Sequence, residues 1–148
     1  MARKVGLVLI IAALISLIVG AVFIWQGFDK YTLITQMVAE EQVDVGIPED
    51  APEGEVIDTI SEAQNGSMVL RSHRQGIAAT YRELLGDGRF DLTNPQHATF
   101  AQAINLENSL QIVSVSLGLT FVMMGIGAFM LLMALVIFLA GYVLLKKD

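Results

Sequence analysis

The chain contains no cysteine, and only 16% of its 148 residues are charged, compared with about 25% in an ordinary soluble domain. The lack of cysteine excludes a disulfide scaffold, a cysteine-ligated zinc or iron–sulfur site and an enzyme with a thiol nucleophile. Nine Lys and Arg against fifteen Asp and Glu give a net charge of −6, which excludes a basic nucleic-acid-binding protein. Hydrophobic residues, at 54%, are in excess instead.

These hydrophobic residues gather in two runs near the ends of the chain. Residues 5–25 contain Ser16 as their only polar side chain, and residues 112–145 are interrupted only by three small hydroxyl residues. A helix needs about 20 apolar residues to cross the hydrocarbon core of a bilayer, and backbone groups inside lipid must bond within their own segment. We therefore expect an all-α membrane protein with transmembrane helices over residues 5–27 and 112–145. The first run is longer than the apolar region of a cleaved signal peptide, which spans about 7–15 residues.

The basic residues predict how the two spans are oriented. Four of them flank the outer ends of the runs: Arg3, Lys4, Lys146 and Lys147. Residues 28–111 carry fourteen acids and only five bases. Because Lys and Arg accumulate on the cytoplasmic side, we expect residues 1–4 and 146–148 to be cytoplasmic tails at the plasma (inner) membrane, with residues 28–111 extracytoplasmic. The expected interfacial anchors are Trp25, Tyr142, Lys146 and Lys147.

The second run is too long for a simple span. Its 34 residues would form a helix of about 51 Å, and fitting this into about 30 Å needs more tilt than the usual range of about 0–40°. The outer turns therefore stand above the hydrocarbon, where an apolar surface must be covered by protein. An antiparallel pairing of Val5 near Leu144 brings residues 28–38 beside residues 112–119, so we expect a helical hairpin that extends above the bilayer. The protruding apolar contact surface consists of Tyr31, Ile34, Met37, Val38, Ile112, Val115 and Leu119.

Glycines mark where the two spans can approach each other. Gly20 and Gly27 are seven residues apart and share one helix face, and the same holds for Gly118 and Gly125. Small residues allow the backbones of membrane helices to come close. The expected pairing places Gly27 near Gly125.

The segment between the spans is expected to be a small helical insert. Residues 45–54 are rich in proline, glycine and acidic residues and predict an extended linker. Residues 55–64 predict a short helix, residues 65–67 a turn, and the following helix is expected to end at Gly86. Asn94-Pro95 is a helix start signal, from which a helix can continue into the second span. So small an insert, without disulfides, has little stability of its own, which predicts a partner or a homo-oligomer.

The candidate catalytic chemistry is sparse. A non-haem iron site needs two His and one carboxylate, and His73 and His97 are the only histidines. They lack the spacing that places two ligands on one helix face, so we expect no metal and no other cofactor. Neither apolar run holds a charged residue, proline, histidine, asparagine or glutamine. The path of a channel or transporter usually contains such residues.

From Ala63 onward, several features can be compared with known families. They are His73, the stretch Thr80–Leu84, the helix Ala98–Leu110, and the glycines Gly118, Gly125 and Gly127. On these residues the chain resembles a family of small two-span bacterial membrane proteins of unknown function, whose members often carry a dioxygenase-like label. The resemblance implies a two-span topology with an extracytoplasmic insert, and it implies no reaction.

These observations favour a non-enzymatic integral membrane protein that acts by protein–protein association. It would be an accessory subunit of a larger membrane complex or a self-associating scaffold, with the lipid bilayer, other membrane subunits or copies of itself as partners and no nucleic acid. An oligomeric pore or transporter component is the alternative. A metal-dependent extracytoplasmic enzyme is the more remote one.

Overall fold

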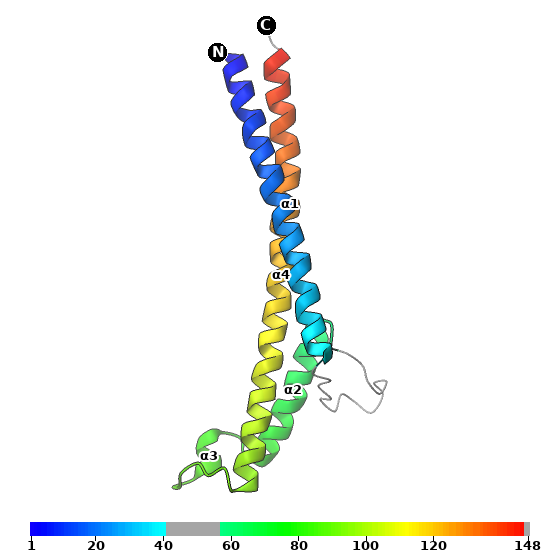
Figure 1. Ribbon diagram of the computed structural model, residues 1–148. Helices are drawn as coiled ribbons and strands as arrows, with labels where there is room; N and C mark the ends of the chain where they lie inside the picture. Colours follow the sequence, from blue (N-terminus) through cyan, green and yellow to red (C-terminus); the bar gives the residue numbers. More distant parts are fainter. Residues whose placement is uncertain (41–56, 147–148) are drawn as a thin grey trace. The chain divides into compact units, whose positions relative to one another are not determined.

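The computed structural model describes residues 1–40 and 57–146, and the regular secondary structure in these ranges is all helical (Figure 1). The four helices are α1 (Ala2–Glu40), α2 (Ile60–Ile77), α3 (Tyr81–Leu85) and α4 (Pro95–Lys146). The expected all-α class is thereby confirmed. The predicted acidic linker, residues 45–54, lies outside the described residues.

Helix α4 begins where the sequence predicts. Asn94 precedes it, and the side-chain oxygen of Asn94 accepts a hydrogen bond of 3.0 Å from the backbone N–H of Gln96. Such a cap satisfies one of the N–H groups that the first turn of a helix leaves unpaired. Pro95, the first helical residue, has no N–H to leave unpaired. From there α4 continues for 52 residues.

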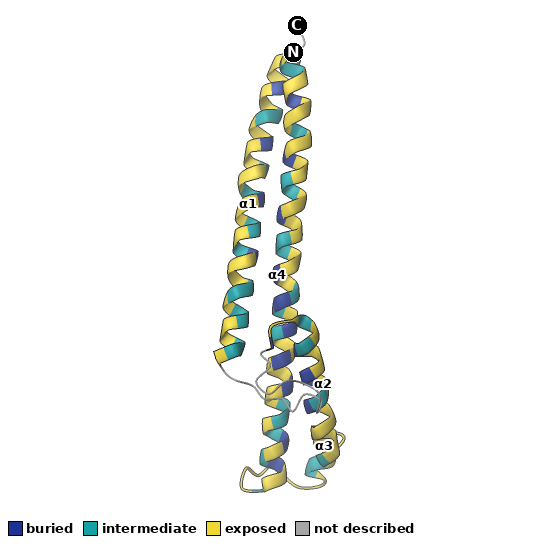
Figure 2. Cartoon of the chain, turned by 90° about the vertical axis from the view of Figure 1, so that its right-hand side faces the viewer, coloured by how far each residue is buried: buried dark blue, intermediate teal, exposed yellow. Residues whose placement is uncertain are grey.

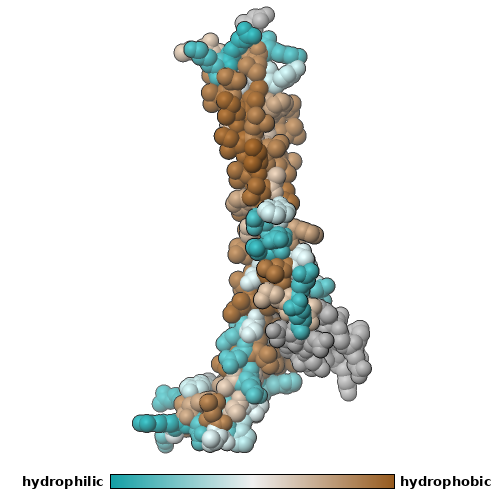
Figure 3. Space-filling model, in the orientation of Figure 1, coloured by the Kyte–Doolittle hydropathy of each residue, from teal (hydrophilic) through white to brown (hydrophobic). Residues whose placement is uncertain are grey.

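Helices α1 and α4 are each long and apolar enough to cross a membrane. They contain 39 and 52 residues, or about 58 and 78 Å at 1.5 Å per residue, against a hydrocarbon core of about 30 Å. In the most apolar window of each helix only 11% of the residues are buried. The chain itself therefore leaves most of this apolar surface uncovered, unlike the core helix of a soluble domain. Figure 3 shows hydrophobic side chains over most of the visible surface of the first part of α1 and the last part of α4, apart from their polar ends.

The chain divides into two compact units. Unit 1 comprises Met1–Thr32 and Leu119–Asp148, and unit 2 comprises Leu33–Gly118. Unit 1 therefore contains parts of α1 and α4 only. Unit 2 contains the remaining parts of these helices together with α2 and α3.

Buried positions recur along both helices of unit 1 (Figure 2), and they are small residues spaced seven apart. On α1 the buried residues of this repeat are Gly6, Ala13, Gly20 and Gly27. On α4 they are Thr120, Gly127, Ala134 and Gly141. A strict seven-residue repeat keeps one face of a helix against its partner over many turns. We call these eight residues the small-residue seam.

The backbones touch along this seam. A methyl group built on Gly20 would place its carbon 2.9 Å from the carbonyl oxygen of Gly127, and one on Gly6 would lie 2.8 Å from that of Gly141. For a methyl group built on Gly27, the nearest backbone atom is the carbonyl oxygen of Thr120, 3.0 Å from the added carbon. As residue numbers rise along α1 they fall along α4, so the two helices pack antiparallel in unit 1. Close approach of this kind requires glycine.

The core of unit 2 lies between α2 and the first part of α4. Its buried cluster consists of Ile57, Ala63, Leu70 and Leu110, with Val38 and Val113 packed against it. The start of α2 is fixed by a capping box, in which Thr59 accepts from the N–H of Glu62 and the Glu62 carboxylate accepts from the N–H of Thr59. This reciprocal pair satisfies two unpaired N–H groups of the first turn.

Two predicted boundaries in unit 2 are wrong. The sequence predicts a turn at residues 65–67, but α2 runs through them, with Gly66 and Ser67 buried and the Ser67 hydroxyl donating to the carbonyl oxygen of Gln64 at 2.8 Å. These small residues lie on the packed face of α2. The helix expected to continue to Gly86 also divides, because Thr80 caps a new helix, α3. That helix does end at Gly86, which has a positive φ of 54° that favours glycine.

Candidate interaction surface

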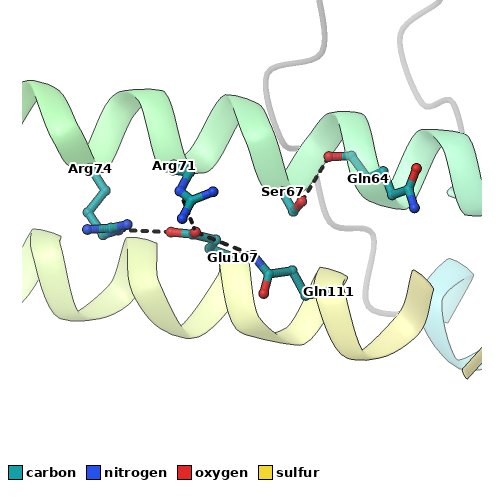
Figure 4. Close-up of polar contacts among 6 residues, drawn as sticks. All are labelled: Gln64, Ser67, Arg71, Arg74, Glu107 and Gln111. Atoms are coloured by element: carbon teal, nitrogen blue, oxygen red, sulfur yellow. Dashed lines mark hydrogen bonds and ion pairs between the residues drawn. The ribbon is translucent and has the colours of Figure 1, made fainter. Parts of the chain in front are cut away.

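An ion pair links α2 to α4 in the interior of unit 2 (Figure 4). Arg74 Nε donates to Glu107 Oε2 at 2.8 Å, and the two side chains are 10% and 5% exposed. The other carboxylate oxygen, Oε1, lies 3.5 Å from Arg71 Nε and accepts from Gln111 Nε2 at 3.4 Å. Arg71 differs from Arg74 in being 58% exposed. Glu107 therefore has partners for both of its oxygens in a site that water hardly reaches.

This arrangement holds α2 and α4 in one register. A buried charge without its partner is strongly destabilising, so a shift of α2 that separated Arg74 from Glu107 would leave the buried Arg74 charge unpaired. The neighbouring contacts are apolar, since Leu70 and Leu110 belong to the core cluster. Among the described residues, every buried side-chain nitrogen and oxygen has a hydrogen-bond partner. The buried polar groups of this site thus pair with each other and hold α2 against α4.

Aromatic rings continue this core toward the start of α4. The Arg74 guanidinium lies over the Phe100 ring at 5.2 Å, and Phe100 is almost completely buried. Tyr81 contacts both Phe100 and Phe90, and Phe90 stacks on His97 with ring centroids 5.4 Å apart. Cation–π and offset aromatic contacts of this kind add to the burial of apolar surface. They connect α3 and the segment after it to α4.

His97 acts as a hydrogen-bond acceptor in this cluster. Its Nδ1 accepts a hydrogen bond of 3.0 Å from the backbone N–H of Asp91. Next to it, the hydroxyl and the backbone N–H of Thr93 donate to the Asp91 carboxylate and lower its pKa. The ring nitrogen Nδ1 of His97 is therefore already engaged in holding the segment before α4.

The opposite side of α4 in unit 2 is not covered by any other residue that the structure describes. Ile112 and Val115 are 66% and 72% exposed. Asn105 and Asn108 are exposed on the same side, because steps of three and four residues return to one helix face. The buried residues Glu107, Leu110 and Ser114 lie on the other side. We call Asn105, Asn108, Ile112 and Val115 the outer face of α4.

The seven residues of the predicted protruding contact surface divide into two groups. Val38 packs on the core cluster of unit 2, Tyr31 contacts the Phe121 ring within unit 1, and Ile34 is half-buried. Four remain exposed: Met37, Ile112, Val115 and Leu119. The expectation that the first helix covers residues 112–119 is not met at Ile112, Val115 and Leu119. The chain uses the other side of α4, where Val113 packs on the core cluster and Thr120 belongs to the small-residue seam.

The predicted packing glycines divide similarly. Gly20 and Gly27 lie in the small-residue seam, but a methyl group at Gly118 or Gly125 would meet nothing within 4 Å. Beside Gly27 the structure places Thr120 and Met124, where the sequence-based register places Gly125. Neighbouring residues point about 100° apart around a helix, so Gly125 faces away from Gly27. The sequence reasoning missed Gly6, Gly127 and Gly141, although the seven-residue repeat is visible in the sequence.

The predicted interfacial anchors lie at the surface of unit 1. Trp25 and Tyr142 are both exposed, and Lys146 Nζ lies 4.6 Å from the centre of the Tyr142 ring. Lys147 lies outside the described residues. Exposed aromatic and basic side chains of this kind are typical of membrane interfaces.

The described residues contain no group of three or more His, Cys, Asp or Glu side chains that could hold a metal ion. His73 is exposed on α2, and His97 is buried at the start of α4. Within residues 1–40 and 57–146 the two histidines are thus not part of a ligand set of the kind that a two-histidine iron site requires.

Comparisons of the chain with models of protein families, with curated proteins and with solved structures found no match.

Proposed function

We propose that this chain is an integral membrane protein that crosses the bilayer with both long helices and acts by binding protein through the outer face of α4. The observation that carries the proposal is the exposure of Ile112 and Val115, at 66% and 72%. Burial of apolar surface is the main favourable term in protein association. Two large β-branched side chains on one helix face supply such surface, and no residue of the described chain covers them.

Lipid accounts for most of the other exposed apolar surface. In unit 1 the uncovered side chains are those of two apolar helices, and hydrocarbon is their natural solvent. Arg3, Lys4 and Lys146 stand at one end of these helices, which favours that end for the cytoplasmic side. The fourteen acids of residues 28–111 then lie on the extracytoplasmic side of a two-span hairpin.

Lipid does not account for the outer face of α4. Val115 is 31 residues before Lys146, which corresponds to about 46 Å of helix. Even a tilt of about 40° leaves it about 36 Å along the membrane normal, beyond a hydrocarbon core of about 30 Å. An apolar face at this height would otherwise meet headgroups and water. Protein is therefore the cover that the proposal assigns to it.

Photo-crosslinking in native membranes tests this proposal. A photoreactive benzophenone side chain at position 115 is expected to give adducts of the chain with protein, whereas the same group at position 102 gives at least tenfold less. Gln102 is the matched control because it is exposed on the same helix, is polar and, being 13 residues before Val115, points about 140° away from it around the helix. Adducts with lipid alone at position 115, or equal protein adducts at both positions, would contradict the proposed association.

A further inference from the structure

We infer that the protein bound by the outer face of α4 is the same face of a second copy of this chain, with the two α4 helices parallel. This inference rests on the proposed function, and it names the partner. The exposed residues at positions 105, 108, 112 and 115 are separated by steps of three, four and three. This is the spacing of the a and d positions in a coiled coil.

Insertion into one membrane requires such a face to be compatible with itself. Two copies inserted in the same orientation are related by a two-fold axis along the membrane normal, so their α4 helices run parallel. In an isologous contact each residue of the seam then lies near its own counterpart. The face must therefore be chemically compatible with itself.

The residues of the outer face satisfy this condition. Ile112 and Val115 are apolar and pack favourably against their own counterparts. Asn105 occupies an a position, and its amide is both a donor and an acceptor, so it can bond to the same amide of a second copy. An asparagine at such a position is known to specify the register of paired helices.

The charge pattern also favours a second copy. Helix α4 carries no charged residue between Glu107 and Lys146, and Glu107 itself is turned inward to Arg74. Like-charge contacts across the seam are therefore absent. A basic partner would be attracted by the acidic residues of the chain, but this face contains none of them.

Disulfide trapping in native membranes tests the inference, because the chain has no cysteine of its own. Mild oxidation of the Val115→Cys variant is expected to convert most of the chain into a covalent dimer. The Leu106→Cys variant is the matched control, since Leu106 is apolar and exposed on α4 but off the outer face; its dimer yield is expected to be at least tenfold lower. Disulfides form only where Cα atoms approach to about 4.4–6.8 Å.

A second variant tests the seam without relying on cysteine geometry alone. Asn105→Asp, added to Val115→Cys, places two carboxylates opposite each other and is expected to lower the dimer yield about tenfold at neutral pH. Acidification should restore the yield because it neutralises these carboxylates. Since Asn105 is exposed, the fold is expected to survive, which an unchanged far-ultraviolet circular dichroism spectrum would verify.

The outcomes separate this inference from the proposed function. Equal dimer yields at positions 115 and 106 would indicate random collision and overturn the self-association. A photo-adduct of position 115 with a different protein, without the disulfide dimer, would overturn the self-association but leave the proposed function standing. The absence of both the dimer and any protein adduct would overturn both.

Discussion

Units 1 and 2 hold their helices together by different means. In unit 1 the contact is made by small residues, and backbone atoms of α1 and α4 lie against each other at Gly20 and Gly127. In unit 2 the contact is made by large apolar and aromatic side chains around the buried pair of Arg74 and Glu107. Both units use parts of the same helix, α4.

The difference reflects the surroundings that we propose for each unit. Lipid tails are as apolar as leucine, so no hydrophobic force drives membrane helices together, and close van der Waals packing must do it. Outside the membrane, burial of apolar surface drives packing. A buried charged pair is tolerated in such a core if both of its members and their hydrogen bonds are in place. Along α4 the packing changes from the ion pair at Glu107 to the glycine contact at Gly127. This change agrees with the proposed change of surroundings from water to lipid.

The largest expected effect comes from removing the carboxylate of unit 2. The Glu107→Ala variant leaves the Arg74 charge buried without a partner, which costs about 3–5 kcal/mol. The Arg71→Ala variant is the control, because Arg71 is 58% exposed and its removal leaves Glu107 paired with Arg74, so a smaller loss is expected. Thermal unfolding in mild detergent, followed by circular dichroism, measures both. Equal losses in the two variants would mean that the buried pair is not what holds α2 on α4.

A smaller effect is expected in unit 1, from filling the small-residue seam. A side chain at Gly20 would push against the carbonyl oxygen of Gly127, 2.9 Å from the added carbon. Overpacking of this kind costs about 1–3 kcal/mol. Gly20→Val is therefore expected to weaken the helix pair in a titration with sodium dodecyl sulfate.

Gly125→Val provides the matched control for this seam. A side chain at Gly125 meets nothing within 4 Å, so the midpoint of the titration should remain close to that of the unchanged chain. If Gly125→Val weakened the pair as much as Gly20→Val, the contrast between the two faces of α4 would be lost.

The smallest effect concerns the start of α2 in unit 2. Thr59→Ala removes the side-chain half of the capping box and is expected to cost about 1 kcal/mol. Hydrogen–deuterium exchange at the first N–H groups of α2 should accelerate, while exchange at the start of α4, which Asn94 caps, should not change. Unchanged exchange in α2 would show that the capping box does not hold this end of the helix.

The same capping box predicts a pH dependence. Burial raises the pKa of Glu62, but hydrogen bonds from the N–H groups of Asp58 and Thr59 and from the Thr59 hydroxyl outweigh it, and the pKa lies below its ordinary value of 4.5. The folded state therefore gains stability above pH 4.5, and this gain disappears as the pH falls through the lower pKa of the folded protein. The melting temperature should therefore fall as the pH is lowered through this range. In the Glu62→Gln variant this fall should be smaller.

Local signals in the sequence predicted much of the fold. The two apolar runs, the start of α4 at Asn94-Pro95 and the stop at Gly86 each depend on residues within a few positions of one another. The turn at residues 65–67 was predicted wrongly because Asn-Gly-Ser is typical of turns, while burial of Gly66 and Ser67 on the packed side of α2 is a tertiary effect. Propensity is a weak guide where packing decides.

The candidate site was less accessible to sequence reasoning. Arg74 and Glu107 are 33 residues apart in the chain, and nothing in their immediate sequence indicates that they pair. Ile112 and Val115 were recognised as surface that needs a cover, but the first helix was expected to provide it. Which side of α4 faces α1 depends on the seven-residue repeat of small residues, and Gly118 and Gly125, which have the same spacing, indicate the wrong side.

The most direct test of the account is the mass of the protein in its own membrane environment. Native mass spectrometry of the chain, extracted with surrounding lipid into nanodiscs without detergent, would measure this mass. The account predicts a species of twice the mass of the chain, which the Asn105→Asp variant reduces to a single chain. A single chain with bound lipid as the only species of the unchanged protein would contradict it.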